Sequence, residues 1–257
     1  MNIIDSHCHL YLPEFQNDLD QVVSRAMEVG VQKFFLPNID SSTIEPMLKV
    51  VEDYPDMCYP MMGLHPTSVK DNYKEELGIV EEELKSGKYV AIGEIGIDLY
   101  WDKTYFKEQV DAFERQIIWA KELNLPIVIH ARDSFQEIFE AMDSLNDDSL
   151  KGIFHCFTGT FDDAKKIMSY GGFKMGIGGV VTFKNGGIDK FLNEIPLQHL
   201  VVETDSPYLS PVPYRGKRNE SAYLAEVLSK MADVYNLTIN EIAEATSSNS
   251  LEIFNIK

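Results

Sequence analysis

The sequence has little cysteine and no long hydrophobic run. Its 257 residues include three cysteines, Cys8, Cys58 and Cys156, and no Cys-x-x-Cys pair, so neither a disulfide framework nor a structural zinc site is expected. No apolar stretch of about 18 residues occurs, which excludes a membrane-spanning helix. The first residues, Met-Asn-Ile-Ile-Asp, lead directly into a predicted strand without a basic or apolar targeting signal, so we expect a cytoplasmic protein.

Positive charge is also scarce. The chain has 23 Lys and Arg against 41 Asp and Glu, a formal net charge of −18, which opposes nonspecific binding of nucleic acid along a basic face. The densest basic cluster is Arg215-Gly-Lys217-Arg218, and a polyanionic substrate would need such a local exception. Much of the acidic surplus lies in predicted helical stretches such as Glu75 to Glu83, where a solvated helix face explains it.

Eight apolar runs rich in β-forming residues recur along the chain. They begin near residues 2, 32, 57, 89, 126, 152, 173 and 200, a mean step of about 28 residues, which is the size of one strand with its crossover helix. Amphipathic segments separate them, and no linker or low-complexity tract interrupts the pattern. The sequence therefore predicts an α/β protein, a (β/α)8 TIM barrel formed as a single domain over residues 1–257.

Local signals support helices between these runs. An apolar stripe over residues 19–27 stops at Gly30, a residue type expected just past a helix end, and a second stripe covers residues 106–120. Two residue pairs have the spacing of capping boxes and are expected to open helices: Ser134 with Glu137, and Thr238 with Glu241.

Side chains that can bind metal stand at or near the ends of five of the apolar runs. A parallel strand buried on both faces should be nearly all Val, Ile and Leu, so an imidazole or carboxylate there is costly unless it meets a metal or another charge. In a (β/α)8 barrel the carboxyl ends of all strands open on one face, where active sites are built. The pattern predicts one metal site from residues far apart in sequence: His7, His9, Glu94, His130, His155 and Asp205.

The spacing within this set suggests its chemistry. His7 and His9 share one face of an extended strand, so their imidazoles can hold one ion together. The full set exceeds what one zinc ion needs and suits two divalent ions that share a carboxylate. Glu94 lies midway in strand order and is the predicted bridge, while Asp205 would hold one ion and accept the proton of the attacking water. We therefore expect metal-assisted hydrolysis, since neither a Gly-x-Ser-x-Gly elbow nor a His-Glu-x-x-His helix is present.

Two further residues on the same face are candidates for substrate contacts. Arg132, two positions after His130, cannot bind metal but can grip a phosphate or carboxylate, unless it pairs with the neighbouring Asp133. His65 follows the third run, where it could contact a phosphate or protonate a leaving group, or could be a loop histidine without a role.

The remaining signals each allow two interpretations. Tyr100 and Trp101 could stack on a base or sugar, or pack locally. Gly176, Gly178 and Gly179 could let a phosphate approach the backbone, or form a tight turn. Side chains expected to play no part are His199, on the surface at the other end of the barrel, and Cys8 and Cys156, small buried residues on the opposite faces of their strands.

Together these motifs resemble the TatD family of metal-dependent deoxyribonucleases, within the amidohydrolase-like barrels. The similarity runs nearly end to end and rests on DSHCHL, IGEIGIDLYWD, LPIVIHARD, FHCFTG, MGIGGVVTFKN, ETDSPYL and PYRGKRNE. The resemblance implies a (β/α)8 fold, a binuclear metal site and phosphodiester hydrolysis in DNA, often exonucleolytic. It would place one metal on His7, His9, Glu94 and Asp205, the other on Glu94, His130 and His155, and both His65 and Arg132 near the substrate phosphate.

Three positions depart from the family pattern. Tyr11 stands where the first motif usually has aspartate, so any support from that carboxylate is missing or supplied elsewhere. Ser221 replaces a proline, and Glu252 stands where an arginine is usual. None is a predicted metal ligand, so metal binding is better supported than substrate preference.

Three functions follow as hypotheses. The first is a nuclease with two divalent ions, Mg, Mn or Zn, that admits DNA ends or single strands through a positive mouth containing Arg132, Arg215, Lys217 and Arg218. The second is hydrolysis of a small amide, lactone or aminoacyl ester by the same metals, because fold and site alone do not choose the bond. The third is a barrel that binds without catalysis. We expect DNA as the partner, no membrane and no obligate protein partner.

Overall fold

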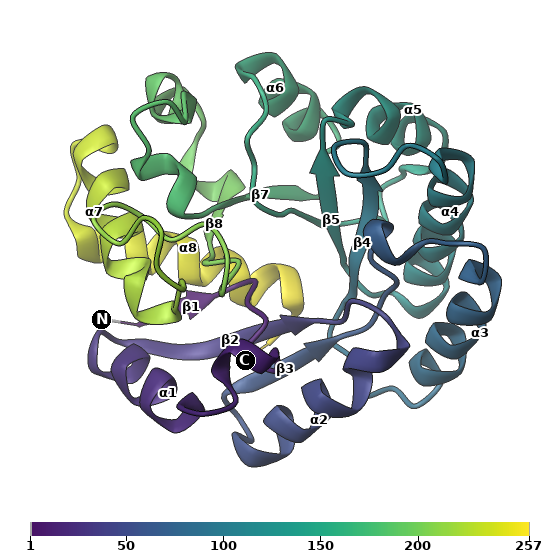
Figure 1. Ribbon diagram of the computed structural model, residues 1–257. Helices are drawn as coiled ribbons and strands as arrows, with labels where there is room; N and C mark the ends of the chain where they lie inside the picture. Colours follow the sequence, from purple (N-terminus) through teal and green to yellow (C-terminus); the bar gives the residue numbers. More distant parts are fainter. Residues whose placement is uncertain (1, 257) are drawn as a thin grey trace.

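The computed structural model describes residues 2–256 and confirms an α/β barrel in a single domain (Figure 1). Eight parallel strands form two sheets, in the orders β1-β2-β3 and β4-β5-β6-β7-β8. Each strand begins within three residues of its predicted start: β1 Ile3–Asp5, β2 Val31–Pro37, β3 Cys58–Met61, β4 Ile92–Asp98, β5 Ile127–Arg132, β6 Gly152–Phe154, β7 Phe173–Ile177 and β8 Leu200–Val202.

Backbone contacts close the two sheets into a barrel. Cys8, just after β1, bridges Ser206 after β8, and Met62 after β3 bridges Ile92 at the start of β4. The Asp205 N–H also donates to the carbonyl oxygen of His7 at 2.9 Å. The two seams therefore hold the carboxyl ends of β1 and β8 together and join β3 to β4, so that all eight strand ends share one face.

Helices surround the strands: α1 Leu19–Glu28, α2 Ile44–Asp53, α3 Tyr73–Leu84, α4 Phe106–Leu123, α5 Phe135–Leu145, α6 Phe161–Ser169, α7 Leu224–Tyr235 and α8 Ile239–Phe254. The alternation is imperfect, because four short 3-10 turns replace a helix between β7 and β8: Gly179–Thr182, Ile188–Lys190, Leu192–Glu194 and Leu197–His199. The other 3-10 turns are Pro13–Phe15, Ser41–Thr43, Pro66–Ser68 and Ser221–Tyr223. No helix among residues 2–256 is both long and apolar enough to cross a membrane.

The structure confirms some of the predicted helix boundaries and capping boxes and contradicts one. Gly30 follows the end of α1 with φ 102°, a conformation that favours glycine, and Thr238 and Glu241 form the predicted capping box of α8. The predicted box of Ser134 with Glu137 is wrong. Ser134 precedes α5, but its hydroxyl donates to the carbonyl oxygen of Ile97 in β4 at 2.6 Å, so a bond to another strand takes the place of the local cap.

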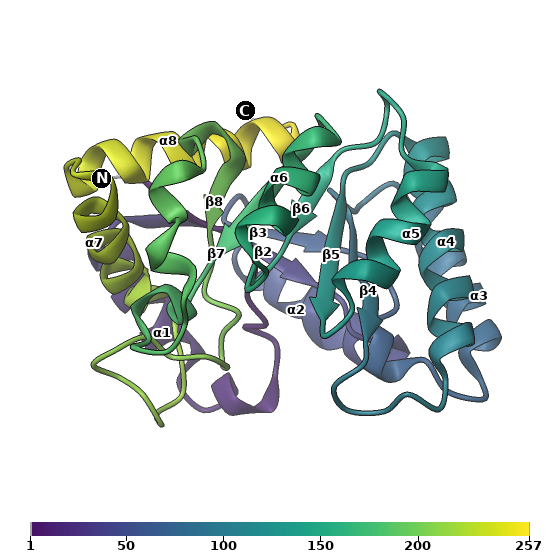
Figure 2. The same ribbon diagram turned by 90° about the horizontal axis from the view of Figure 1, so that it is seen from above.

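The core has two parts. A large cluster lies between the strands and the outer helices, and a smaller one fills the barrel, where Ile4, Val128 and Val201 pack beneath Phe35 and Phe254. The rings of Phe35 and Phe254 stack with centroids 3.9 Å apart. Helix α8 thereby closes the amino end of the barrel, and Figure 2 shows it across the end opposite to the tips of β4 and β5. Only the carboxyl end is left open for a site.

Candidate metal centre

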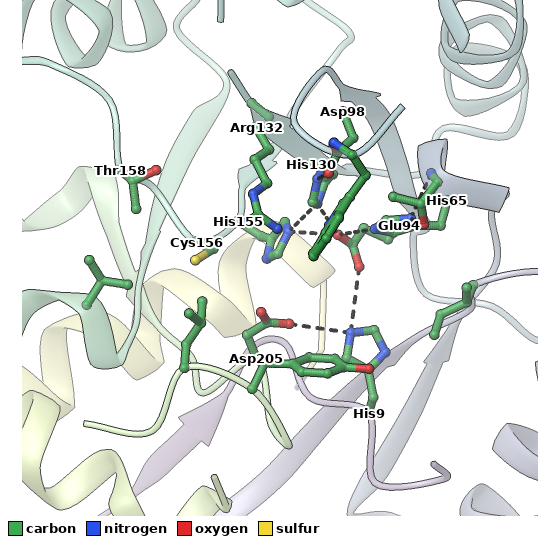
Figure 3. Close-up of a pocket in the computed structure, with 17 residues that line it drawn as sticks. His9, His65, Glu94, Asp98, His130, Arg132, His155, Cys156, Thr158 and Asp205 are labelled. Atoms are coloured by element: carbon green, nitrogen blue, oxygen red, sulfur yellow. Dashed lines mark hydrogen bonds and ion pairs between the residues drawn. The ribbon is translucent and has the colours of Figure 1, made fainter. Parts of the chain in front are cut away.

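The six predicted ligands gather at this open end. His7 and His9 follow β1, Glu94 and His130 lie within β4 and β5, His155 follows β6, and Asp205 stands three residues past β8. Five elements distant in sequence thus contribute to one cluster, which borders a cavity of about 770 Å³ (Figure 3). The convergence expected from strand periodicity is therefore present in the structure.

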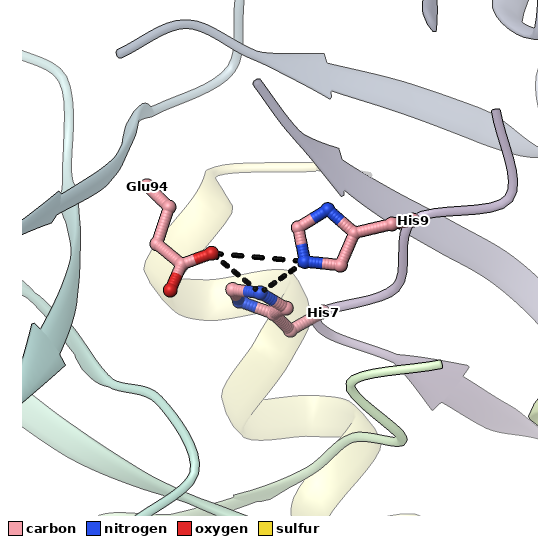
Figure 4. A group of neighbouring side chains, drawn as sticks. All are labelled: His7, His9 and Glu94. Atoms are coloured by element: carbon pink, nitrogen blue, oxygen red, sulfur yellow. Dashed lines mark hydrogen bonds and ion pairs between the residues drawn. The ribbon is translucent and has the colours of Figure 1, made fainter. Parts of the chain in front are cut away.

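One group of donors surrounds His7 and His9 (Figure 4). His7 Nε2 lies 3.3 Å from His9 Nε2, 3.1 Å from Glu94 Oε2 and 3.7 Å from Asp205 Oδ1. His9 Nε2 lies 3.7 Å from Glu94 Oε2 and 3.5 Å from Asp205 Oδ1. Two donors that each lie about 2.1 Å from one ion are roughly 3.0–3.4 Å apart in octahedral or tetrahedral geometry. These four residues therefore fit one divalent ion.

A second group surrounds the other oxygen of the same carboxylate. Glu94 Oε1 lies 2.7 Å from His155 Nε2, 2.8 Å from His130 Nδ1 and 3.2 Å from His65 Nε2. His130 Nδ1 and His155 Nε2 are 3.2 Å apart. Glu94 thus divides its two oxygens between two sets of imidazoles, as expected of a bridging ligand. His65, predicted only as a substrate contact, also belongs to this group.

The electrostatics of the cluster centre on Glu94. Burial alone would raise its pKa, but the charges of His155, His65 and His7 hold the pKa of this carboxyl well below its usual range. The same carboxylate, with Glu203, raises the pKa of His155 against the opposing effect of burial. Buried imidazoles and carboxylates that stabilise each other's charged forms are suited to exchange protons for a metal cation.

Two carboxylates that contact the outer nitrogens of these histidines were not predicted from the sequence. Asp98 Oδ2 lies 2.9 Å from His130 Nε2, and Glu203 Oε1 lies 3.4 Å from His155 Nδ1. Such outer carboxylates orient metal-binding imidazoles and raise their basicity. Asp98 is four residues after Glu94 within β4, so strand alternation was a signal that could have placed it on the same side, whereas Glu203 and Asp205 lie beyond the end of β8, where this signal does not apply.

Asp5 joins the first strand to the last. Its carboxylate accepts hydrogen bonds from the Thr204 backbone at 2.9 Å and from the Thr204 and Ser221 hydroxyls, both at 2.6 Å. Burial raises the pKa of Asp5 to about 6, although these hydrogen bonds oppose the rise. The network fixes the segments that carry His7 and Asp205, and it gives Ser221, one of the departures from the family pattern, a structural role.

The other two departures also have partners. The Tyr11 hydroxyl bonds His9 Nδ1 at 2.8 Å, so the support expected from a carboxylate is supplied by a phenol. Glu252 accepts a hydrogen bond from Lys174 Nζ at 3.0 Å, and it lies on α8, at the closed end of the barrel. Only Tyr11 therefore touches the candidate metal centre.

The structure changes the interpretation of two residues, Cys156 and Gly176. Cys156 does not point away from the site; it lines the cavity, because β6 ends at Phe154 and strand alternation no longer applies beyond it. Gly176 lies within β7 and not in a turn, and the approach of a phosphate to its backbone stays a prediction. A Cβ on Gly176 would lie 2.0 Å from Glu203 Oε2, so the missing side chain leaves space for the carboxylate behind His155.

The basic residues do not form one mouth. Arg132 lines the cavity with no ion pair in residues 2–256, and the alternative pairing with Asp133 is absent there. Arg218 binds both oxygens of Asp18 at 2.7 Å. Arg215 lies over the ring of Phe183 and Lys217 beside the ring of Tyr214, and neither lines the cavity, so their contact with a substrate stays a prediction.

A parallel barrel that gathers imidazoles and carboxylates around a shared glutamate defines a hydrolase of the metal-dependent barrel class. A family profile described as TatD related DNase matches residues 4–255. The chain belongs to this family, and with it to the metal-dependent hydrolases.

Similarity to individual proteins supports the same family assignment. The chain is 38% identical over 255 residues to the uncharacterized metal-dependent hydrolase YabD of Bacillus subtilis, with 99% of each chain covered. It is 32% identical to the uncharacterized hydrolase YcfH of Escherichia coli, over 100% of this chain and 97% of the relative. The crystal structure of YjjV, a TatD homologue from Escherichia coli, superposes with a TM-score of 0.93 at 28% identity, covering 99% and 98% of the two chains.

Proposed function

We propose that this hydrolase cleaves phosphodiester bonds of DNA at ends or in single strands, as an exonuclease, with two divalent ions. The observation that carries the proposal is the division of the Glu94 carboxylate. Its Oε2 lies 3.1 Å from His7 Nε2, and its Oε1 lies 2.7 Å from His155 Nε2. Two ions bridged by this residue would lower the pKa of bound water and polarise the phosphoryl group. Four imidazoles favour zinc or manganese over magnesium as the ions.

Protein side chains supply the remaining steps. Burial would raise the pKa of Asp205, but the charges of the nearby His155 and His7 imidazoles lower it, so this carboxylate is ionised and able to accept the proton of an attacking water. Arg132, which has no ion pair within residues 2–256, can donate two parallel hydrogen bonds to a phosphate. His65 Nδ1 accepts from the Thr67 N–H at 3.1 Å, which leaves an Nε2–H that faces Glu94 and the cavity.

The test begins with metal analysis of the purified protein. End-labelled single- and double-stranded DNA is then incubated with the protein and Mg, Mn or Zn. We expect shortening from the labelled strand's end, abolished in Glu94→Ala and Asp205→Asn. Arg132→Ala should lose diester cleavage by roughly 100-fold while its metal content is unchanged, because a charge-assisted bidentate contact contributes on the order of 3 kcal/mol.

A matched control uses a histidine away from the site. His199 ends the 3-10 turn before β8 and does not line the cavity, so His199→Ala should keep full activity. Cleavage that persists in Glu94→Ala would show that the activity belongs to a contaminant, and a protein without metal or nuclease activity would contradict the proposal.

One observation favours a second candidate. Arg132 is the one Lys or Arg side chain that lines the cavity within residues 2–256, which is little positive charge for a polyanion. A small amide, lactone or aminoacyl ester substrate would need no more positive charge than this one side chain supplies. Turnover of such compounds by the metal-loaded protein, without cleavage of any DNA substrate, would favour this function.

A further inference from the structure

Three neighbouring side chains, two of which line the cavity, have no role in the metal centre. Tyr100 and Trp101 follow β4, and Arg132 ends β5; we call these three residues the aromatic shelf. The Arg132 guanidinium lies 3.8 Å from the centre of the Tyr100 ring and 5.2 Å from that of Trp101. Trp101 and Arg132 line the cavity, and 69% of the Trp101 surface is exposed. Burial of an aromatic core therefore does not explain Trp101.

The shelf is anchored to the metal centre by one carboxylate. Asp98 Oδ1 accepts hydrogen bonds from the backbone N–H groups of Tyr100 at 3.0 Å and Trp101 at 3.1 Å. The other oxygen, Oδ2, holds His130 Nε2 at 2.9 Å. The loop that presents the aromatic rings is thus fixed relative to a candidate ligand. A substrate group that rests on the rings would be placed at a defined distance from the reacting bond.

The opposite wall offers a second exposed aromatic side chain. Tyr208 and Leu209 also line the cavity, and Tyr208 is 48% exposed with its ring 6.3 Å from that of His9. Among residues 2–256, the cavity therefore has Arg132 as its one Lys or Arg side chain, a cluster suited to metals, and large apolar surfaces beside them. This combination suits a ligand with one phosphate and a flat, neutral ring.

We propose that the aromatic shelf is a stacking site for one nucleobase, next to the phosphate held by Arg132. The inference rests on the proposed function and deepens it, because it assigns the substrate as a single terminal nucleotide with its base. Stacking requires no positive charge, so it is compatible with a net charge of −18. It also tolerates every base, since each has a π face. A long basic groove is then unnecessary.

Intrinsic fluorescence tests binding without catalysis. The chain has two tryptophans, and Trp119 is 9% exposed in α4, so a ligand at the cavity changes mainly the emission of Trp101. We expect dAMP to quench the emission and deoxyribose 5-phosphate, which has no base, to leave it unchanged. The Trp101→Phe variant should show no quenching by dAMP. Equal effects of the two ligands, or quenching that persists in Trp101→Phe, would overturn the proposal.

Matched substrates then test the shelf in the reaction. One oligonucleotide ends in a normal nucleotide and the other in an abasic residue. We expect the wild type to have a KM about 5- to 150-fold lower for the normal end, the range given by one base–aromatic stack. Trp101→Ala should lose this preference, and Trp101→Phe should keep most of it. As a control, Ile118→Ala changes an exposed side chain of α4 outside the cavity and should behave as wild type.

The outcomes separate the two proposals. If no DNA is cleaved by any variant, the proposed function fails, while dAMP quenching still decides whether the shelf binds a base. If DNA is cleaved equally with and without a terminal base, the function stands and the stacking site is refuted.

An independent observation concerns Tyr11. This tyrosine is buried, and its hydroxyl donates its single proton to the carbonyl oxygen of Pro37. Its contact with His9 Nδ1, at 2.8 Å, must then be donated by an Nδ1–H. The Nε2 atom of His9 is therefore left with its lone pair facing His7, Glu94 and Asp205. We infer that Tyr11 is a positioning residue that selects the metal-binding tautomer of His9.

The histidine resonances of the metal-free protein report the tautomer directly by NMR. We expect His9 in the wild type to carry its proton on Nδ1 and the Tyr11→Phe variant, which keeps the ring, to populate both tautomers. Calorimetric titration with Zn²⁺ or Mn²⁺ should show one of two binding steps weakened about 10- to 100-fold in Tyr11→Phe. The Tyr11→Asp variant, which restores a carboxylate, should recover it. Tyr89→Phe, which removes a tyrosine hydroxyl bonded to Glu83 outside the cavity, is the control, and an unchanged tautomer in Tyr11→Phe would refute the role.

Discussion

Gly176 controls the space available to a side chain that holds a metal ligand. A Cβ at this position would lie 2.0 Å from Glu203 Oε2, and Glu203 is completely buried, so neither group can move aside without disturbing β7 or β8. The orientation of His155, which follows β6, thus depends on the absence of one methyl group on the neighbouring strand β7.

Gly176→Ala should therefore destabilise the protein by about 1–3 kcal/mol, the usual cost of overpacking, and weaken metal binding through His155. Urea unfolding and metal titration measure the two effects. Gly78→Ala is the matched control, because a Cβ on this α3 residue meets no atom within 4 Å and alanine should stabilise the helix by up to about 1 kcal/mol. Equal effects of both changes would contradict this account.

At the scale of elements, we expect α8 to contribute to the stability of the barrel but not to metal binding or catalysis. Its last residue, Phe254, stacks on Phe35 inside the barrel with ring centroids 3.9 Å apart, at the end opposite to the metal centre. Phe254→Ala should cost about 3–5 kcal/mol of unfolding free energy by leaving a cavity. Metal affinity at low temperature should be unchanged. Denaturant unfolding and calorimetry test this pair of outcomes, and a loss of metal binding in the folded variant would show that the two ends are coupled.

The arrangement of strands in the barrel determines how much of the fold and site could be predicted from the sequence. The strand starts and the convergence of the six candidate ligands followed from periodicity, because a barrel converts alternation and strand order into position. Alternation along β4 could have placed Asp98 beside Glu94, but the roles of Glu203 and Asp5 depend on contacts between distant segments, such as Asp5 with Thr204, which no local pattern encodes. The sequence also could not show that Arg218 of the basic cluster pairs with Asp18, 200 residues earlier in the chain, while the substrate contacts of Arg215 and Lys217 stay a prediction. The Ser134 cap failed because Ile97 offered a competing acceptor.

At the scale of the whole molecule, bound metal should contribute to the fold. The cluster joins residues from β1, β4, β5, β6 and β8, so ions held there cross-link the two sheets. A metal present at 100 times its dissociation constant stabilises the native state by about 2.7 kcal/mol. We expect a chelator to lower Tm by roughly 5–10 °C for a chain of this size. Calorimetry with EDTA, and readdition of Mn²⁺ or Zn²⁺, measures the effect; an unchanged Tm would argue against structural cross-linking.

The charge of the whole molecule sets the salt dependence of DNA binding. The protein has a net charge of −18, and Arg132 is the cation at the cavity. Binding of a DNA strand should therefore release the counterions of about one phosphate. The slope of log K against log salt for single-stranded DNA should then be about −0.7, and Arg132→Ala should bring it close to zero. Binding is measured with Glu94→Ala to prevent cleavage. If Arg215 and Lys217 also hold phosphates, the slope becomes roughly −2, and Arg215→Ala would reduce it, which would extend the substrate beyond its terminal nucleotide.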